Sequence, residues 1–108
     1  MPTNLGEFEQ LVLLALLRLG ENGYGVTVRD QLGRRAGRSV SLGTVYKTLL
    51  RLESKGLVSA HLGEPTPERG GRRKKHYAVT LTGRKSLGRS LAALRKLSHG
   101  LDTGLELI

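Results

Sequence analysis

The stretch Ser41–Lys55, with the sequence SLGTVYKTLLRLESK, determines how the rest of the chain is interpreted. Ser41 can cap a helix by accepting hydrogen bonds from the N–H groups of its first turn. Leucine and valine then recur every three or four residues, which predicts a helix with one apolar stripe. The stripe consists of Leu42, Val45, Leu49 and Leu52. On its own, this pattern is typical of a helix that buries one side and leaves the other in water.

The side of this helix opposite the stripe carries polar and charged groups. At about 100° per residue, it presents Gly43, Thr44, Lys47, Arg51 and Ser54. It has two cations and no acid, and its glycine permits close approach to a partner. Tyr46 lies about 80° from the stripe, so its ring can either pack against the protein or be presented outward. A solvated face is the simplest explanation for an isolated helix, so the neighbouring segments decide the interpretation.

Composition favours a nucleic-acid partner. The chain has 108 residues, which predicts one domain, and its 18 basic and 9 acidic residues give a formal net charge of +9. Such a charge favours nucleic acid first and an anionic membrane surface second, unless it reflects a basic proteome. The chain lacks cysteine, which excludes disulfides and thiolate metal sites. The apolar run Leu11–Leu17 is too short to span a bilayer and nothing resembles a signal peptide, so a cytoplasmic location is expected.

Two helices are predicted ahead of Ser41. Residues 4–19 form the first, with Asn4 as its cap, and the segment Leu11–Leu17 is apolar on every side. This indicates either that a second subunit covers one face of the helix or that the chain itself wraps it. A glycine-rich turn leads to a second helix at about 24–36. A short connection to the Ser41 helix then completes the arrangement of a helix-turn-helix.

A hairpin is predicted after the Ser41 helix. Gly56 ends that helix, and two short strands follow at 57–62 and 76–80. The segment Gly63–Lys75 between them contains two prolines and three glycines, so it forms the tip of a long hairpin. Its second half is strongly basic, with Arg69, Arg72, Arg73, Lys74 and Lys75. A helix-turn-helix followed by a hairpin predicts a winged helix.

A final helix is predicted from Thr80, which can cap it, to about Leu97. Its apolar residues repeat at an average spacing close to 3.5, which is typical of two helices packed along a seam. The series is Leu87, Leu91, Leu94, Leu97, Leu101, Leu105 and Ile108. Gly100 and Gly104 weaken the last turns, so the end of the helix is left open.

The predicted fold is mainly α-helical with a small β-hairpin. It comprises a winged helix-turn-helix at residues 1–80 and an additional C-terminal dimerisation helix at 81–108. The first and last helices offer more apolar surface than one small domain can hide, so we expect a homodimer. Two-fold symmetry would place the two recognition helices about 34 Å apart, one turn of DNA. The leucines expected at the interface are Leu13, Leu14, Leu17, Leu87, Leu91, Leu94, Leu97 and Leu101.

Several short motifs occur in a characteristic order: Tyr24-Gly25-Val26, Ser41–Tyr46, Leu49, Arg51–Glu53, Lys55–Val58, Gly70–Lys74, Tyr77, Thr80 and Gly83. In this order they resemble the PadR family of transcriptional regulators over nearly the whole chain. The resemblance implies a homodimeric winged-helix repressor that binds a palindromic operator. Leu42 and Lys47 stand where family members often have proline, so the operator sequence cannot be transferred from relatives. The sequence gives no support for a small-molecule effector.

Double-stranded DNA is therefore the expected partner, rather than a membrane. We expect the Ser41 helix to enter the major groove and the basic hairpin to follow phosphates, unless that hairpin is only a solvated loop. The residues expected to contact DNA are Ser41, Thr44, Tyr46, Lys47, Arg51, Arg72, Arg73 and Lys74. Lys47 is expected to contact guanine or a phosphate, whereas Arg51, near the helix end, is expected to clamp a phosphate.

An enzyme is not expected, and neither is a metal or a cofactor. The three histidines, His61, His76 and His99, show no metal-ligand spacing. No glycine-rich phosphate loop follows a strand and opens a helix, and no serine has an adjacent base with an orienting acid. Two other functions remain open: a winged-helix adaptor that binds proteins, and a nucleic-acid-binding protein that ignores sequence.

Overall fold

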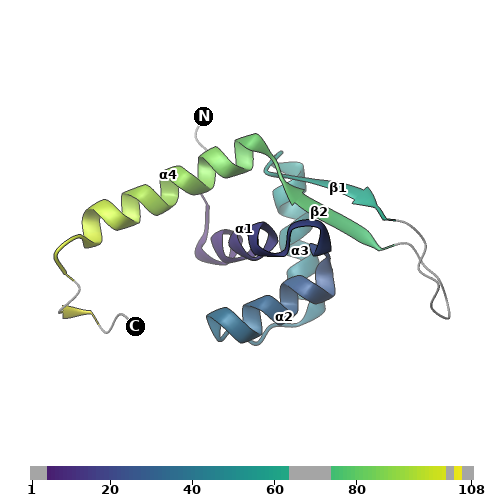
Figure 1. The fold of residues 1–108 in the computed structure, drawn as a ribbon, viewed down its shortest axis with the longest axis horizontal. Helices are drawn as coiled ribbons and strands as arrows, with labels where there is room; N and C mark the ends of the chain where they lie inside the picture. Colours follow the sequence, from purple (N-terminus) through teal and green to yellow (C-terminus); the bar gives the residue numbers. More distant parts are fainter. Residues whose placement is uncertain (1–4, 64–73, 102–103, 106–108) are drawn as a thin grey trace.

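The computed structural model describes residues 5–63, 74–101 and 104–105, and it shows a small helical bundle with a hairpin at one end (Figure 1). The helices are α1 (Glu7–Leu19), α2 (Gly25–Ala36), α3 (Leu42–Ser54) and α4 (Leu81–Ser98), with a 3-10 turn (Gly20–Asn22) between the first two. The strands β1 (Val58–Leu62) and β2 (Lys75–Val79) pair antiparallel. This order confirms the predicted winged helix-turn-helix with an additional C-terminal helix.

Hydroxyl side chains cap the N-termini of two helices, as predicted. Ser41 Oγ accepts a hydrogen bond from the Thr44 N–H at 3.1 Å, and this bond caps α3. Thr80 Oγ1 accepts from the Gly83 N–H at 3.0 Å and caps α4 in the same way. Gly56 follows the end of α3 with a φ of 75°, the left-handed conformation that glycine adopts without strain.

The first two helices begin later than predicted. Gly6, not Asn4, precedes the first turn of α1, and the Glu9 side chain accepts a hydrogen bond from the Gly6 N–H at 3.0 Å. Asn4 itself lies outside the described residues. In α2, the first helical residue is Gly25, because Tyr24 has an extended backbone and donates its N–H to Thr27 Oγ1 at 3.1 Å.

The core lies between α1, α2, α3 and the base of the hairpin. Its most deeply buried side chains are Val12, Leu13, Val28, Val45, Leu49, Leu52 and Leu57. The chain itself therefore covers the inner side of α1, while Leu14 and Leu17 on its outer side remain partly exposed. Leu13 and Leu87 are buried within the chain, so they offer no surface to a second subunit; their assignment to a dimer interface is corrected accordingly.

Only the first half of α4 packs against the rest of the chain. Its buried residues are Gly83, Ser86 and Leu87, whereas Leu94 is 59% exposed and Leu97 is 82% exposed. In Figure 1, the second half of the helix projects away from the bundle. Leu94 and Leu97 therefore present apolar surface that no other described residue of the chain covers.

The helix ends at Ser98, close to the predicted Leu97. Gly100 follows with a φ of 83°, so the backbone leaves the helical direction there. Leu101 and Leu105 consequently lie beyond the helix, which corrects their predicted place in the helical seam; Ile108 is outside the described residues. In the described part of the chain, no helix is long and apolar enough to cross a membrane.

Candidate nucleic-acid interface

The exposed side of α3 is a stripe of four residues at helical spacing. The helix buries Val45, Thr48, Leu49 and Leu52, and on the opposite side lie Gly43, Lys47, Leu50 and Ser54. We call these last four residues the outer stripe. Leu42 is only half-buried and Thr48 takes its expected place in the core, because the buried side is centred nearer to Leu52 than the leucine pattern suggested.

The first turn of α3 combines a cap with exposed polar groups. Ser41 Oγ and Thr44 Oγ1 lie 3.0 Å apart, so the two predicted hydroxyls bond to each other as well as capping the helix. Both residues are exposed. The N-terminal end of a helix also carries a partial positive charge, which favours an approaching phosphate. This turn is therefore suited to an anionic partner, although the cap already uses Ser41 Oγ as an acceptor.

Tyr46 both packs against the protein and is partly exposed, which are the two possibilities that its position on the helix left open. Its ring rests on the backbone of α2, because a Cβ placed on Gly25 would lie 2.5 Å from Tyr46 Cζ and 2.6 Å from its hydroxyl oxygen. The side chain is nevertheless 39% exposed. Gly25, which the sequence did not single out as functional, is therefore the residue that allows Tyr46 to lie beside the outer stripe.

Arg51 is held by an ion pair that the sequence did not predict. Its Nε lies 3.1 Å from Glu9 Oε2, and the Lys55 Nζ lies 2.8 Å from the same oxygen. The Glu9 side chain is only 7% exposed. Burial by itself raises the pKa of Glu9, but hydrogen bonds from Lys55 and from the Gly6 N–H outweigh burial, so the net pKa lies below its ordinary value. Arg51 thus joins α3 to α1, and contact with a phosphate remains a prediction for its exposed part.

The base of the hairpin is attached to α2 and α3 through its basic residues. The Lys74 Nζ lies 4.5 Å from the centre of the Tyr24 ring and donates to the Tyr24 hydroxyl at 3.2 Å. The Lys75 Nζ lies 3.7 Å from Glu53 Oε1 of α3. His76 contacts the same tyrosine edge-on, with ring centres 5.4 Å apart. These contacts join the base of the hairpin to Tyr24 and to α3.

The structure describes only one of the three hairpin residues that were predicted to contact DNA. Lys74 is half-buried against Tyr24, so its charge is presented at the base of the hairpin rather than at a free tip. Arg72 and Arg73 lie outside the described residues. Of the predicted DNA contacts, Ser41, Thr44, Tyr46 and Lys47 are all exposed at the cap or in the first half of α3, with Thr44 and Tyr46 on opposite flanks of Lys47. Lys74 lies immediately before β2.

Leu50 is an exposed residue that the sequence analysis did not assign. It is 53% exposed in the middle of the outer stripe, between Lys47 and Ser54. The same count of about 100° per residue would have placed it there, within about 30° of Gly43. It was missed because leucine was treated only as a core residue.

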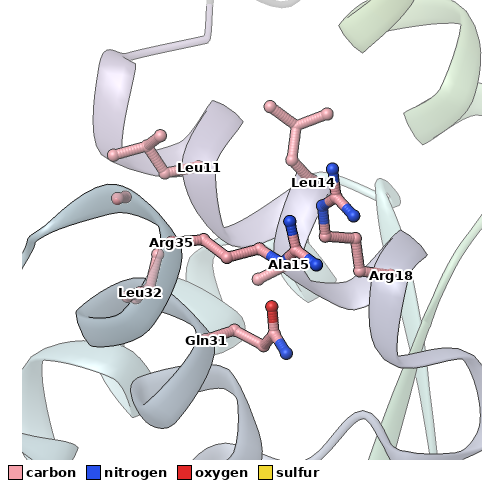
Figure 2. Close-up of a pocket in the computed structure, with 8 residues that line it drawn as sticks. Leu11, Leu14, Ala15, Arg18, Gln31, Leu32 and Arg35 are labelled. Atoms are coloured by element: carbon pink, nitrogen blue, oxygen red, sulfur yellow. The ribbon is translucent and has the colours of Figure 1, made fainter.

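A second feature lies between α1 and α2. A groove there has a volume of about 250 Å³. Figure 2 shows the residues that line it, which are Leu11, Leu14, Ala15, Arg18, Gln31, Leu32, Arg35 and Ala36. In the described part of the chain, Gln31 Oε1 is a buried oxygen without a hydrogen-bond partner. The groove adjoins the partly exposed leucines of α1. It is thus an apolar hollow with a polar floor and a cationic rim.

Histidines and acids do not gather into a metal site in the described residues, where no group of three or more ligating side chains is found. His61 and His76 stack with ring centres 5.5 Å apart, and His76 Nδ1 lies 2.8 Å from the Glu21 carbonyl oxygen. These rings help to join β1, β2 and the turn before α2. Their contacts are those of a structural pair.

A helix-turn-helix, a basic hairpin and an exposed cationic helix face together define a winged-helix DNA-binding regulator of transcription. The chain belongs to the PadR-like family of transcriptional regulators, because the model of that family matches residues 13–89. The match covers the second half of α1, all of α2 and α3, the hairpin, and the docked half of α4. No curated protein was found to match the chain.

Solved structures agree with this assignment. A PadR family transcription regulator from hypervirulent Clostridium difficile R20291 is 26% identical, with a TM-score of 0.72 over 91% of this chain and 97% of that chain. A PadR family transcriptional regulator from Eggerthella lenta DSM 2243 is 29% identical, with a TM-score of 0.67 over 94% of this chain and 88% of that chain. A PadR-like transcriptional regulator from Bacillus cereus strain ATCC 14579 is 23% identical, with a TM-score of 0.72 over 94% and 93%, and it supports the fold.

Proposed function

We propose that the protein is a cytoplasmic, sequence-specific repressor that binds a palindromic operator as a homodimer. The observation that carries this proposal is the outer stripe of α3, which no described residue covers and which presents Lys47 beside Lys74 and Lys75 at the base of the hairpin. A helix of this kind fits the major groove, and the hairpin cations lie beside it where phosphates would run. A dimer bound across promoter DNA would repress by excluding other proteins from it.

The residues divide into base readers and phosphate contacts. Lys47 projects from the outer stripe, so it is assigned to a base edge, with Thr44 and Tyr46 contacting either a base or a phosphate. Arg51 and Lys74 are tethered within the protein at Glu9 and Tyr24, so they are assigned to the phosphate backbone. The hairpin residues Arg72 and Arg73 are assigned to phosphates as well.

The homodimer is supported by uncovered apolar surface on two helices. Leu94 and Leu97 project from the free half of α4, and Leu91 lies half-buried at its start. Leu14 and Leu17 are partly exposed on the outer side of α1, and Leu14 also lines the groove of Figure 2. We assign the leucines of one α4 to the α1 face of the partner, an isologous arrangement that would cover both surfaces at once. Leu101 follows the end of α4 and is assigned to the edge of the same interface.

Selection of bound fragments from random duplex DNA tests the proposal. An inverted repeat with half-sites about one helical turn apart, about 34 Å, is the expected result. Competition with unrelated duplex DNA distinguishes the two alternatives. A specific regulator keeps its operator, a sequence-indifferent binder does not, and a protein-binding adaptor shows little affinity for any DNA.

A pair of substitutions tests the division of roles. Lys47→Ala is expected to change the selected sequence and to lose discrimination at one position by about 1–3 kcal/mol, because it removes a base contact. Arg72→Ala is expected to weaken binding evenly across sequences. It should also reduce the slope of log affinity against log salt concentration by about one. If both variants lose affinity evenly for all sequences, Lys47 does not read bases.

A further inference from the structure

Leu50 is the apolar member of the outer stripe. It is 53% exposed, and its neighbours on that side are Lys47, three residues before, and Ser54, four residues after. A single exposed leucine is ordinary on a protein surface. This one differs in its location, because it lies on the helix face that a regulator of this fold presents to the major groove.

The side chains that flank Leu50 on α3 contact other parts of the protein, whereas the middle of the outer stripe projects outward. On one flank, Tyr46 rests on Gly25 and Glu53 lies 3.7 Å from the Lys75 Nζ. On the other flank, Arg51 turns toward Glu9 at 3.1 Å. Lys47 and Leu50 are consequently the two long side chains at the centre of the face.

The major groove offers one good partner for an aliphatic side chain. Base edges there carry mostly hydrogen-bond donors and acceptors, and their largest apolar group is the C5-methyl group of thymine. A leucine placed against a donor or acceptor would remove it from water without replacing its hydrogen bond, which is costly. Against a thymine methyl group it would instead bury apolar surface on both sides.

We propose that Leu50 reads a thymine methyl group in each half-site of the operator. The inference rests on the proposed binding of an operator by α3, and it identifies one base of that operator. Leu50 lies about 4.5 Å beyond Lys47 along the helix axis, since each residue adds about 1.5 Å. One base-pair step is about 3.4 Å. The thymine therefore lies within about two base pairs of the base that Lys47 contacts.

Deoxyuridine substitution provides a direct test, because it removes only the methyl group of a thymine. In the operator obtained by selection, each thymine is replaced in turn and the dissociation constant of the intact protein is measured. One position per half-site is expected to weaken binding by about fourfold, and substitution of both half-sites by about fifteenfold, from the burial of a methyl-sized group. Replacing any other thymine, whose methyl group no side chain contacts, is expected to change the dissociation constant little.

Two variants connect this effect to Leu50. Because both subunits carry the change, Leu50→Ala is expected to weaken binding to the thymine operator by about fifteenfold, as the double deoxyuridine substitution does. It is also expected to bind thymine and deoxyuridine equally at the sensitive position. Leu81→Ala is the matched control, because Leu81 is also an exposed helical leucine, at the start of α4, and lies off the outer stripe. With Leu81→Ala, deoxyuridine at the sensitive position is expected to weaken binding as much as it does for the parent protein. Both variants are expected to melt close to the parent protein, since both side chains are exposed.

The outcomes separate this inference from the function on which it rests. If no operator emerges from selection, the proposed specific binding itself is wrong. If an operator emerges but no deoxyuridine weakens binding, Leu50 does not read a methyl group. If Leu50→Ala keeps the sensitivity of the parent protein, another residue contacts the methyl group and the inference is overturned.

Discussion

Tyr46 belongs to α3, but its position depends on Gly25 of the preceding helix, α2. Gly25→Ala would place a methyl group 2.5 Å from Tyr46 Cζ, so the ring must move away. Because the contact is with the far end of a side chain, we expect a change in folding free energy of no more than about 2 kcal/mol. Affinity for the operator is expected to fall about tenfold, equivalent to about 1.4 kcal/mol, as Tyr46 leaves its place beside the outer stripe.

Gly33→Ala is the matched control for this prediction. Gly33 lies in the same helix, and among the described residues a Cβ there would meet no neighbouring group within 4 Å. This variant is expected to gain slightly in stability through helix propensity and to bind the operator normally. Binding measured by fluorescence anisotropy and melting by circular dichroism distinguish the two. Equal affinity of both variants would show that Tyr46 plays no part in DNA binding.

Glu9 is a buried acid whose charge holds two cations of α3. We expect Glu9→Gln to cost about 1–2 kcal/mol at neutral pH, a discounted value because Arg51 is half exposed. The folded pKa of Glu9 is lowered, so its stabilisation is fully present above the pKa of the unfolded chain and is lost as pH falls through the folded value. The difference between parent and variant should therefore be constant near neutral pH and shrink below about pH 4–5.

Denaturant unfolding at several pH values measures this difference. Glu7→Gln is the control, since Glu7 is exposed and pairs with Arg38 at the protein surface. It is expected to change stability by less than about 1 kcal/mol at any pH. A Glu9→Gln difference that does not shrink in acid would mean that packing, rather than charge, is what Glu9 contributes.

At the scale of elements, α4 is attached to the domain through a close backbone contact. A Cβ placed on Gly83 would lie 2.1 Å from the Leu57 carbonyl oxygen, and backbone cannot turn aside as a side chain can. Gly83→Ala is therefore expected to displace the first turn of α4 and to cost about 1–3 kcal/mol. Gly88→Ala is the control, because a Cβ placed there has no neighbouring group within 4 Å in the described part of the chain. Thermal melting of both variants tests this, and equal melting temperatures would contradict it.

The elements themselves were predictable because their signals are local. The caps at Ser41 and Thr80 and the stop at Gly56 act within a few residues, and the structure confirms each of them. The helical periodicity of α3 is confirmed at Val45, Leu49 and Leu52. The end of α4 was less certain because Gly100 weakens a helix without forbidding it.

Contacts between distant parts of the chain were not predictable in the same way. Glu9 pairs with Lys55 across 46 positions, and the periodicity of either helix alone carries no sign of that pairing. The burial of Leu13 depends likewise on which side of an all-apolar helix faces the core, and only the packed bundle decides it. The candidate site was thus predicted on α3, while its supports on α1 and α2 were not.

At the scale of the whole molecule, the free half of α4 carries the prediction of a dimer. The double substitution Leu94→Asn and Leu97→Asn removes apolar surface without changing charge, and both positions are exposed in the single chain. We expect the parent protein to show the mass of two chains in light scattering at micromolar concentration, and the variant to show one. Leu81→Asn, an exposed leucine at the start of α4, is the control and should remain dimeric. A parent mass of one chain would overturn the dimer, and a dimeric double variant would overturn this interface.

The same variant connects dimerisation to DNA binding through salt. A dimer that neutralises about six phosphates or more should lose roughly a thousandfold in affinity between 50 and 200 mM salt. A monomer contacts one half-site and half as many phosphates, so the slope of log affinity against log salt should fall to about half. The substitutions are uncharged, so a changed slope reports the number of subunits on the DNA rather than a lost cation. An unchanged slope in a variant shown to be monomeric would mean that one chain makes all the phosphate contacts, and the palindromic operator would have no physical basis.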